Sequence, residues 1–161
     1  MLVKLYALPS LEQALAAVAT HGIVVKRAIA PERNGVVDWV RTHFASSVSE
    51  VETAFAQVPA ACFVAQHEGC IVGFACYDVT ARNFFGPEGV EAAMRGKGIG
   101  RALLLSALHA QRAAGYAYAI IGGVGPAAFY EKCVGATSIE GSTPGIYAAT
   151  ANTGAERRQP E

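Results

Sequence analysis

A glycine-rich loop directly in front of a strongly apolar helical pattern is the feature that most constrains this chain. The loop covers residues 95–100, Arg-Gly-Lys-Gly-Ile-Gly, and the helical pattern follows over 101–112. Glycine at alternate positions lets the backbone adopt turn conformations closed to other residues, so that successive N–H groups can converge on one anion. The helix adds the free N–H groups of its first turn and the positive end of its dipole. The segment therefore predicts an anion-binding loop at the start of a helix.

Two common phosphate-binding motifs do not fit this loop. A Walker A loop needs glycine at the position of Glu91 and Ser or Thr at that of Gly98. A dinucleotide-binding fingerprint needs glycine in place of Arg101, or glycine or alanine in place of Leu103, depending on where it starts. Both motifs are excluded here. Two interpretations of the loop remain: an anion-binding loop of another kind, or simply a glycine-rich turn before a core helix.

Length and composition favour one globular domain, which we expect to span residues 1–161. Of the 161 residues, 52% are apolar and 16% charged, and the formal charge is zero. This balance gives no general affinity for nucleic acid or an anionic membrane, so neither is expected as a partner. No apolar run approaches membrane-spanning length, and the first nine residues lack the long apolar region of a signal peptide, which predicts a cytoplasmic protein.

The cysteines and histidines do not form a metal-binding pattern. The cysteines are irregularly spaced and make no Cys-x-x-Cys pair, so buried free thiols are favoured over disulfides. The histidines are too scattered to be ligands of one ion, and we expect no metal. The residues concerned are Cys62, Cys70, Cys76, Cys133, His21, His43, His67 and His109.

Strand and helix patterns alternate along the chain, which predicts a layered α/β or α+β domain with a mixed sheet. Residues 83–90 carry Gly86, Pro87 and Gly89, and because proline cannot donate to a ladder, we expect a bulge or an unpaired edge there. Strands are expected at 2–8, 23–29, 61–65, 70–78, 83–90, 116–121, 136–139 and 146–149, and helices at 10–20, 31–44, 47–58, from the loop to about 114, and 126–134.

Two segments carry a resemblance to a known family. The loop fits Arg/Gln-x-x-Gly-x-Gly/Ala and is similar to the acyl-CoA pyrophosphate loop of the GNAT acetyltransferase superfamily. Residues 129–136, Phe-Tyr-Glu-Lys-Cys-Val-Gly-Ala, resemble the family's Tyr-Glu-Lys-x-Gly-Phe segment, with one more residue before Gly135 and Ala136 in place of the usual aromatic residue. The order of elements over 23–150 resembles the whole GNAT fold, a central mixed sheet flanked by helices.

The chain departs from the family's pattern in three places. The family often has Asn before the short helix, where it helps to hold pantetheine, but residues 122–125 are Gly-Gly-Val-Gly. Pro87 is unusual in the strand before the loop. Residues 1–22 form an extra strand and helix with no assigned function, and the polar tail over 151–161 is expected to be disordered.

The resemblance implies an acetyl-CoA-dependent N-acetyltransferase that moves an acetyl group to a primary amine by direct attack in a ternary complex. The loop would bind the pyrophosphate, the end of the preceding strand would hold the pantetheine arm, and the N–H of Val90 would stabilise the oxyanion. The implied cofactor-binding residues are Glu88, Gly89, Val90, Arg95, Gly96, Lys97, Gly98, Ile99, Gly100, Arg101 and Phe129. The side chain of Arg95 could instead only brace the loop.

Two residues are candidates for the proton transfers. Tyr130, placed near the sulfur by the resemblance, is the candidate general acid for the leaving thiolate, and packing as an ordinary aromatic residue is the alternative. Glu88 is the first candidate for the general base, ahead of Glu52 and His43, with a role as a turn carboxylate as the alternative. For Trp39, Phe44, Tyr77 and Cys133, simple core packing is the better hypothesis.

Two other functions stay open. Residues 123–128, Gly-Val-Gly-Pro-Ala-Ala, satisfy a dinucleotide fingerprint, with Glu140 as a ribose ligand, and would suit an oxidoreductase; the short helix and Pro126 speak against it. A non-catalytic acyl-CoA sensor is the second alternative, because the usual Asn is missing. The acceptor, a small-molecule or peptide amine, is not specified by the sequence, and a homodimer formed through exposed strand edges is possible in principle.

Overall fold

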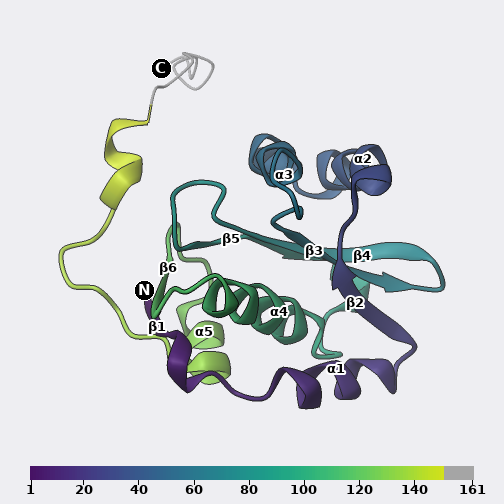
Figure 1. The fold of residues 1–161 in the computed structure, drawn as a ribbon, viewed down its shortest axis with the longest axis horizontal. Helices are drawn as coiled ribbons and strands as arrows, with labels where there is room; N and C mark the ends of the chain where they lie inside the picture. The colour runs from purple at the N-terminus through teal and green to yellow at the C-terminus, as the bar shows by residue number, and fades with distance from the viewer. Residues whose placement is uncertain (151–161) are drawn as a thin grey trace, which may run out of the picture.

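A six-stranded mixed sheet with helices on both faces forms the molecule (Figure 1). The structure is a computed structural model that describes residues 1–150, and the tail expected over 151–161 lies outside the described residues. The strands are β1 (Leu2–Lys4), β2 (Ile23–Arg27), β3 (Cys62–His67), β4 (Cys70–Tyr77), β5 (Phe84–Val90) and β6 (Tyr118–Ile121). The α-helices are α1 (Leu11–Ala19), α2 (Arg33–His43), α3 (Val48–Phe55), α4 (Ile99–Ala113) and α5 (Ala127–Val134).

The strands follow the order β1-β6-β5-β4-β3-β2 across the sheet. All neighbours are antiparallel except β5 and β6, which run parallel. Helices α2 and α3 cover one face, whereas α1, α4 and α5 lie on the other (Figure 1). The predicted fold class, a mixed sheet flanked by helices, is confirmed.

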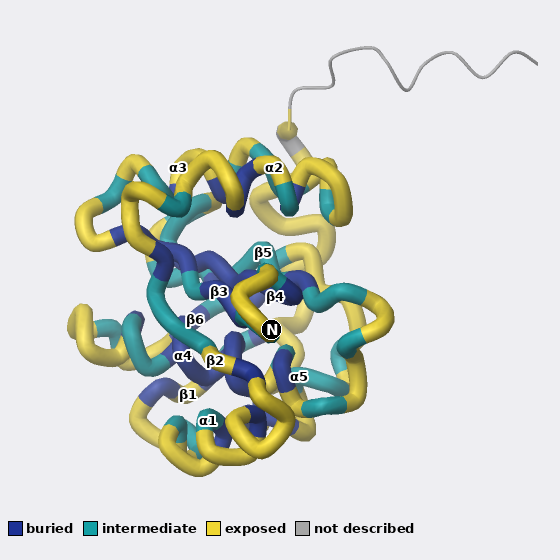
Figure 2. The backbone as a smooth tube through the Cα atoms, turned by 90° about the vertical axis from the view of Figure 1, so that its right-hand side faces the viewer, coloured by how far each residue is buried: buried dark blue, intermediate teal, exposed yellow. Residues whose placement is uncertain are grey.

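Helix α4 is the central core element. Its residues Ala102–Ala107 and Leu108 are almost completely buried against the sheet, as the dark segments of Figure 2 show. A Cβ on Gly73 of β4 would lie 3.0 Å from Leu103 Cδ1, so a larger residue there would push the helix away from the sheet. Because α4 packs so closely against β4, the position of its N-terminus beside the end of β5 is fixed.

Residues with strong local preferences stand at several helix ends and turns. The hydroxyl of Ser10 accepts a hydrogen bond from the N–H of Gln13 and caps α1, and Gly22 follows that helix with a positive φ of 70°. Gly135, with φ 62°, ends α5. The β3–β4 hairpin turns through Glu68 and Gly69, both with positive φ.

Strand β5 is irregular, as expected, but it is not an edge strand of the sheet. Its register with β4 shifts between Ala75 and Tyr77, which confirms the predicted bulge. Although β5 lies between β4 and β6 in the middle of the sheet, its second half also has the unpaired edge that was expected as the alternative. Pairing with β6 is limited to Phe84 and Phe85, so the two strands part beyond that point. A gap therefore opens beside the second half of β5.

The two strands expected after α5 do not form. Residues 136–139 contribute a single bridge, between Thr137 and Leu2, and Gly145–Ala149 is a 3-10 helix. The free edge of β6 is used instead by β1 from the start of the chain. The expected strand 2–8 is correspondingly short, because the chain turns into a 3-10 helix over Leu5–Ala7. Residues 1–22 thus complete the sheet.

Candidate active site

The loop before α4 has the conformation that its glycines predict. Gly96 and Gly98 both have φ of 81°, in the left-handed region that favours glycine, and Gly98 is the N-cap of α4. The first backbone bond of the helix runs from the N–H of Ala102 to the carbonyl of Gly98, at 3.1 Å. The N–H groups of residues 99–101 come before that bond and have no acceptor within the helix. They are the donors expected for an anion site.

A third glycine lets this helix end approach its neighbours. A Cβ on Gly100 would lie 3.4 Å both from Oε1 of Glu88 on β5 and from the ring of Phe129 on α5. Three elements that are distant in the sequence therefore meet at the first turn of α4. The meeting point leaves a cavity of about 590 Å³. Its lining is Phe44, Glu88, Gly89, Val90, Arg95, Gly96, Gly98, Ile99, Gly100, Arg101, Pro126, Phe129 and Tyr130. Among the candidate cofactor-binding residues, Lys97 alone is not in this lining.

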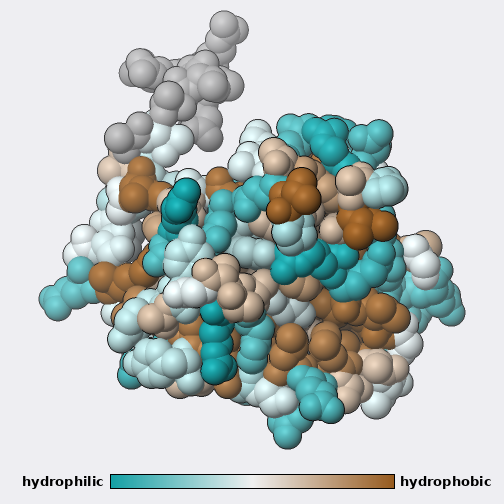
Figure 3. Space-filling model, viewed as in Figure 1, coloured by the Kyte–Doolittle hydropathy of each residue, from teal (hydrophilic) through white to brown (hydrophobic). Residues whose placement is uncertain are grey.

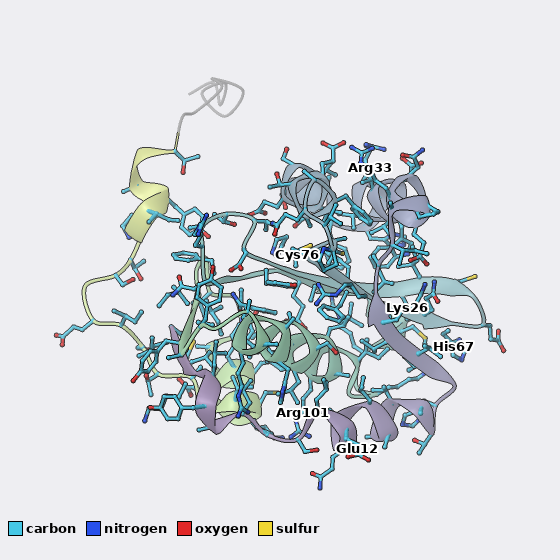
Figure 4. All side chains as sticks on the ribbon, viewed as in Figure 1. Glu12, Lys26, Arg33, His67, Cys76 and Arg101 are labelled. Carbon is cyan, nitrogen blue, oxygen red and sulfur yellow. The ribbon has the colours of Figure 1, made fainter. Side chains whose placement is uncertain are left out.

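The three cations of the loop are placed differently. The Nε–H of Arg95 donates to the carbonyl of Val90 at 3.1 Å, so this side chain ties the loop to the end of β5. Lys97 lies outside the lining, with its Nζ 3.6 Å from Sδ of Met94. Arg101 projects from the first turn of α4 and lines the cavity; Figure 4 places it on the opposite side of the sheet from Arg33 of α2.

The end of β5 presents backbone groups to the gap beside it. The N–H of Glu91 donates to the carbonyl of Val72 on the β4 side, at 3.0 Å. Successive N–H groups of a strand point to opposite sides, so the N–H of Val90 points away from β4, where β6 no longer pairs. This N–H is available to a ligand that enters the gap between the two strands.

Glu88 brings a carboxyl group to the wall of the cavity without a partner. The residue keeps some exposed surface, but its Oε1 is buried and has no hydrogen-bond partner among the described residues. Burial raises the pKa of Glu88 to about 8, because water no longer stabilises the charged form. The carboxyl is therefore mostly protonated at neutral pH, and it becomes a carboxylate as the pH rises through about 8.

Tyr130 lines the same cavity from α5. Its ring packs edge-on against Phe85 and Phe129, with centroids 6.2 and 5.1 Å away. Burial, followed by the charges of Glu88 and Cys133, raises the pKa of the phenol well above its ordinary value, so it stays a hydrogen-bond donor. Burial also raises the pKa of the nearby Cys133 thiol, which therefore stays protonated.

The weaker candidate bases lie elsewhere. Glu52 faces Arg33, with 3.7 Å between its Oε1 and Nη2, and does not line the cavity. The ring of His43 stacks on Trp39, and its Nδ1 lies 2.9 Å from the carbonyl of Trp39. Neither residue is in a position to serve this cavity.

Phe44 and Pro126 line the cavity, although neither was among the candidates. A Cβ on Gly89 would lie 2.7 Å from the ring of Phe44, which therefore fills the space that a side chain on β5 would take. Glycine inside a strand pattern often marks such a close approach. Gly89 was thus the signal in the sequence, but it could not say which residue approaches.

Three other observations bear on function. The dinucleotide alternative is not favoured, because no strand parallel to β6 follows α5 within residues 1–150. In that same part of the chain, no three His, Cys, Asp or Glu side chains are grouped so that they could hold a metal ion. The described helices are also too short or too polar to cross a membrane.

Comparison with known proteins bears on the fold and on the family resemblance. Residues 59–133 match the family model of the acetyltransferase (GNAT) domain. A comparison with curated proteins gave no match. Among solved structures, the chain is similar to the GCN5-related glucosamine N-acetyltransferase region of a fungal multi-domain GH3 β-N-acetylglucosaminidase, at 14% identity and a TM-score of 0.68 over 83% of this chain and 19% of that one.

A second similar structure is the GCN5-related N-acetyltransferase from Sphaerobacter thermophilus, at 19% identity and a TM-score of 0.55 over 70% of this chain and 40% of that one. The chain therefore spans only about a fifth and two fifths of the lengths of these two proteins. At such identities the likeness concerns the fold. The match of residues 59–133 to the family model and the likeness in fold confirm the resemblance to the GNAT acetyltransferases that was drawn from the loop and the short helix.

Proposed function

We propose that the protein transfers an acetyl group from acetyl-CoA to a primary amine by direct attack. One observation carries the proposal. The cavity joins the free N–H groups at the start of α4 to the open backbone of β5 and to the hydroxyl of Tyr130. These are the groups needed, in this order, by a diphosphate, a pantetheine arm and a departing thiolate.

The diphosphate would bind at the loop. The N–H groups of residues 99–101 and the positive end of the helix dipole attract an anion, and the glycines at 96, 98 and 100 leave room for it. Arg101 adds a guanidinium from the lining. Lys97 would have to turn from Met94 towards the phosphates to contribute its charge.

The pantetheine arm and the thioester would lie in the gap beside β5. The backbone of residues 88–90 faces this gap, so it can bind the amides of the arm as a further strand would. The N–H of Val90 is the donor that we assign to the oxyanion of the tetrahedral intermediate. The ring of Phe44 fills the space that a side chain on Gly89 would take and closes the cavity on that side.

Tyr130 is the group that we assign to the leaving thiolate. As sulfur departs, negative charge builds on it, and a phenol within reach stabilises or protonates it. A phenol with a raised pKa keeps its proton throughout the working pH range. The hydroxyl therefore arrives at the thiolate as a donor in every turnover.

Glu88 is the base that we assign to the amine. An ammonium group cannot attack a thioester until it loses a proton, and the carboxylate of Glu88 can accept that proton directly or through water. Because burial holds the pKa of Glu88 at about 8, the reaction should speed up as the pH rises through this value.

The acceptor is proposed as a small-molecule or peptide amine, and the reaction is placed in the cytoplasm. The four cysteines are free thiols, which accords with a reducing compartment. An acyl-CoA sensor without turnover is the remaining alternative. A thiol-release assay with acetyl-CoA against an amine library, run beside calorimetry with CoA, decides between them: binding without release with any amine would favour the sensor, and no binding would contradict both.

A further inference from the structure

A second cavity lies between the end of β6 and the chain that follows α5. Its volume is about 690 Å³, within the range of small-molecule sites. Phe84 and Ile120 form one wall, and Ile139, Ile146 and Tyr147 form the other. The second wall belongs to the segment that was expected to be a pair of strands, and Figure 3 shows apolar surface where this segment runs beside the sheet.

This cavity lies on the sheet face opposite α4. Side chains of successive strand residues point to opposite faces. Phe85 contacts Tyr130 of α5, so its neighbour Phe84 points towards the face covered by α2 and α3. Figure 1 shows the 3-10 helix Gly145–Ala149 on that same side of the sheet. Tyr147 lies near Thr80, whose hydroxyl donates to Glu50 of α3 at 2.5 Å.

The two cavities meet at the point where β5 and β6 part. The first is lined by Pro126, and the second by the residues on either side of it, Gly125 and Ala127. On β5, the boundary between the two cavities lies at Phe84 and Phe85, which are the residues that pair with β6 before the strands part. A molecule in the second cavity therefore approaches the gap beside β5 from the face opposite the helix that would hold the diphosphate.

The same face is closed further along β5. The ring of Phe44 sits against Gly89, and it packs against Trp39 and Phe74 with centroids 5.7 and 5.6 Å away. This aromatic cluster occupies the space on this face beside the end of the strand. The second cavity is an open route on the same face.

The lining of the second cavity favours a ligand whose bulk is uncharged. All the side chains in its lining are uncharged, and Ser138, Ser142 and Thr143 are polar. The α-ammonium group of Met1 donates a hydrogen bond to the carbonyl of Ile121 at 2.7 Å. Val124, Ile139, Ile146 and Tyr147 each keep 38% or more of their surface exposed around it. A second cation on the acceptor would lose water there without gaining a partner. An apolar body would instead cover exposed apolar surface.

From this arrangement we infer that the second cavity is the acceptor site, and that the acceptor is a primary amine on an apolar, otherwise uncharged body, such as an arylalkylamine. The inference rests on the proposed acetyl transfer, whose chemistry it leaves unchanged. It adds the class of the amine and the side from which the amine enters. The ammonium group would point towards the gap beside β5, and the apolar body would lie between Phe84 and Ile146.

The first test compares amines of equal charge with acetyl-CoA as donor. 2-Phenylethylamine and glucosamine both carry one ammonium group, but one body is apolar and the other polar; spermidine adds further cations. We expect kcat/KM for 2-phenylethylamine to exceed the other two by at least about tenfold. Equal or faster turnover of glucosamine or spermidine would overturn the inference while leaving acetyl transfer intact. Faster transfer from octanoyl-CoA than from acetyl-CoA, abolished by the variant below, would assign the cavity to the acyl chain and also overturn it.

A charge placed on the wall tests the location. Ile146→Asp should lower kcat/KM for 2-phenylethylamine by about tenfold and leave CoA affinity unchanged. Val24→Asp on β2 is the matched control, because Val24 and Ile146 are similarly exposed, at 58% and 54%. An Ile146→Asp protein that acetylates 2-phenylethylamine as well as Val24→Asp does would contradict the assignment.

A binding measurement separates this inference from the proposed reaction. Amide chemical shifts are recorded while 2-phenylethylamine is added to the CoA-saturated protein. Shifts at residues 138–147 and at Gly122 support the acceptor site even if no turnover occurs. Shifts confined to Trp39 and Phe44, or no shifts at all, would overturn it.

Discussion

The two cavities that meet at the divergence of β5 and β6 are built in opposite ways. The first is formed largely by one continuous stretch, residues 88–101, whose glycines and helix start present backbone N–H groups. The second is assembled from Met1, the ends of β5 and β6, and residues 138–147, and it presents apolar side chains. Backbone donors suit a ligand with a constant chemical form, whereas exposed side chains can change with the partner. This difference accords with the proposal that the first cavity binds the cofactor and the second the acceptor.

The largest expected effect concerns chemistry in the first cavity. Tyr130→Phe keeps the ring and its contacts with Phe85 and Phe129 but removes the hydroxyl. Because the donor acts only as thiolate forms, kcat should fall by about 10- to 10³-fold, with the KM for acetyl-CoA nearly unchanged. Steady-state kinetics of Tyr130→Phe measures both constants. Tyr116→Phe is the control, because Tyr116 is also partly buried but lies beyond the far end of α4. A raised KM with normal kcat would make Tyr130 a binding residue.

The next effect concerns the base. Glu88→Gln should reduce kcat/KM by about 10²-fold and remove its rise with pH. In the wild type, burial raises the pKa of Glu88 to about 8, so its carboxylate form is scarce at pH 7 and predominates at pH 9. The measurement is a pH–rate profile from 6 to 10. Glu52→Gln is the control, because Glu52 faces Arg33 outside the cavity. A profile that is the same in Glu88→Gln and wild type would exclude this residue as the base.

The sequence predicted the first cavity because its signals are local. The spacing of Gly96, Gly98 and Gly100, followed at once by an apolar helix, specifies an N-terminal turn of α4 wherever the rest of the chain goes. The same holds for the cap at Ser10 and the end of α5 at Gly135. Such elements depend on a few neighbouring residues, so a pattern of spacing is enough to place them.

The second cavity could not be predicted, because it depends on which segment reaches the free edge of β6. Residues 136–139 have a strand-like pattern, but β1 pairs with β6 more than 110 residues away in the sequence. Only Thr137 then finds a partner, on Leu2. The seating of Phe44 against Gly89 was hidden for the same reason. Which of several distant segments pairs with a given strand cannot be predicted from the local periodicity of the sequence.

A third prediction tests whether the first cavity relies on its backbone. Gly98→Val introduces a branched side chain at φ 81° and should weaken CoA binding by at least about 2 kcal/mol, or roughly 30-fold. Gly115→Val is the control, because Gly115 also has a positive φ, 99°, at the other end of α4, and has open space around it. Both variants should lose stability through backbone strain. Calorimetry in which the two variants bind CoA equally well would reject the loop as the diphosphate site.

The smallest effects come from two glycines that each hold an aromatic ring, one in each cavity. A Cβ would lie 2.7 Å from Phe44 at Gly89 and 2.8 Å from the hydroxyl of Tyr147 at Gly122. Phe44 is wedged among other rings, so Gly89→Ala should overpack the site and cost about 1–3 kcal/mol of unfolding free energy.

Gly122→Ala meets a ring that can move, because Tyr147 is 39% exposed and can swing towards solvent. Its unfolding free energy should therefore fall by less than about 1 kcal/mol. The displaced ring alters the wall of the second cavity, so the KM for 2-phenylethylamine should change by about threefold while CoA affinity stays the same. Denaturant unfolding and steady-state kinetics measure both quantities, and Gly35→Ala, which meets no atom within 4 Å, is the control for exchanging glycine for alanine. If Gly122→Ala weakened CoA binding and left the acceptor KM unchanged, the assignment of the cofactor to the first cavity and of the acceptor to the second would be wrong.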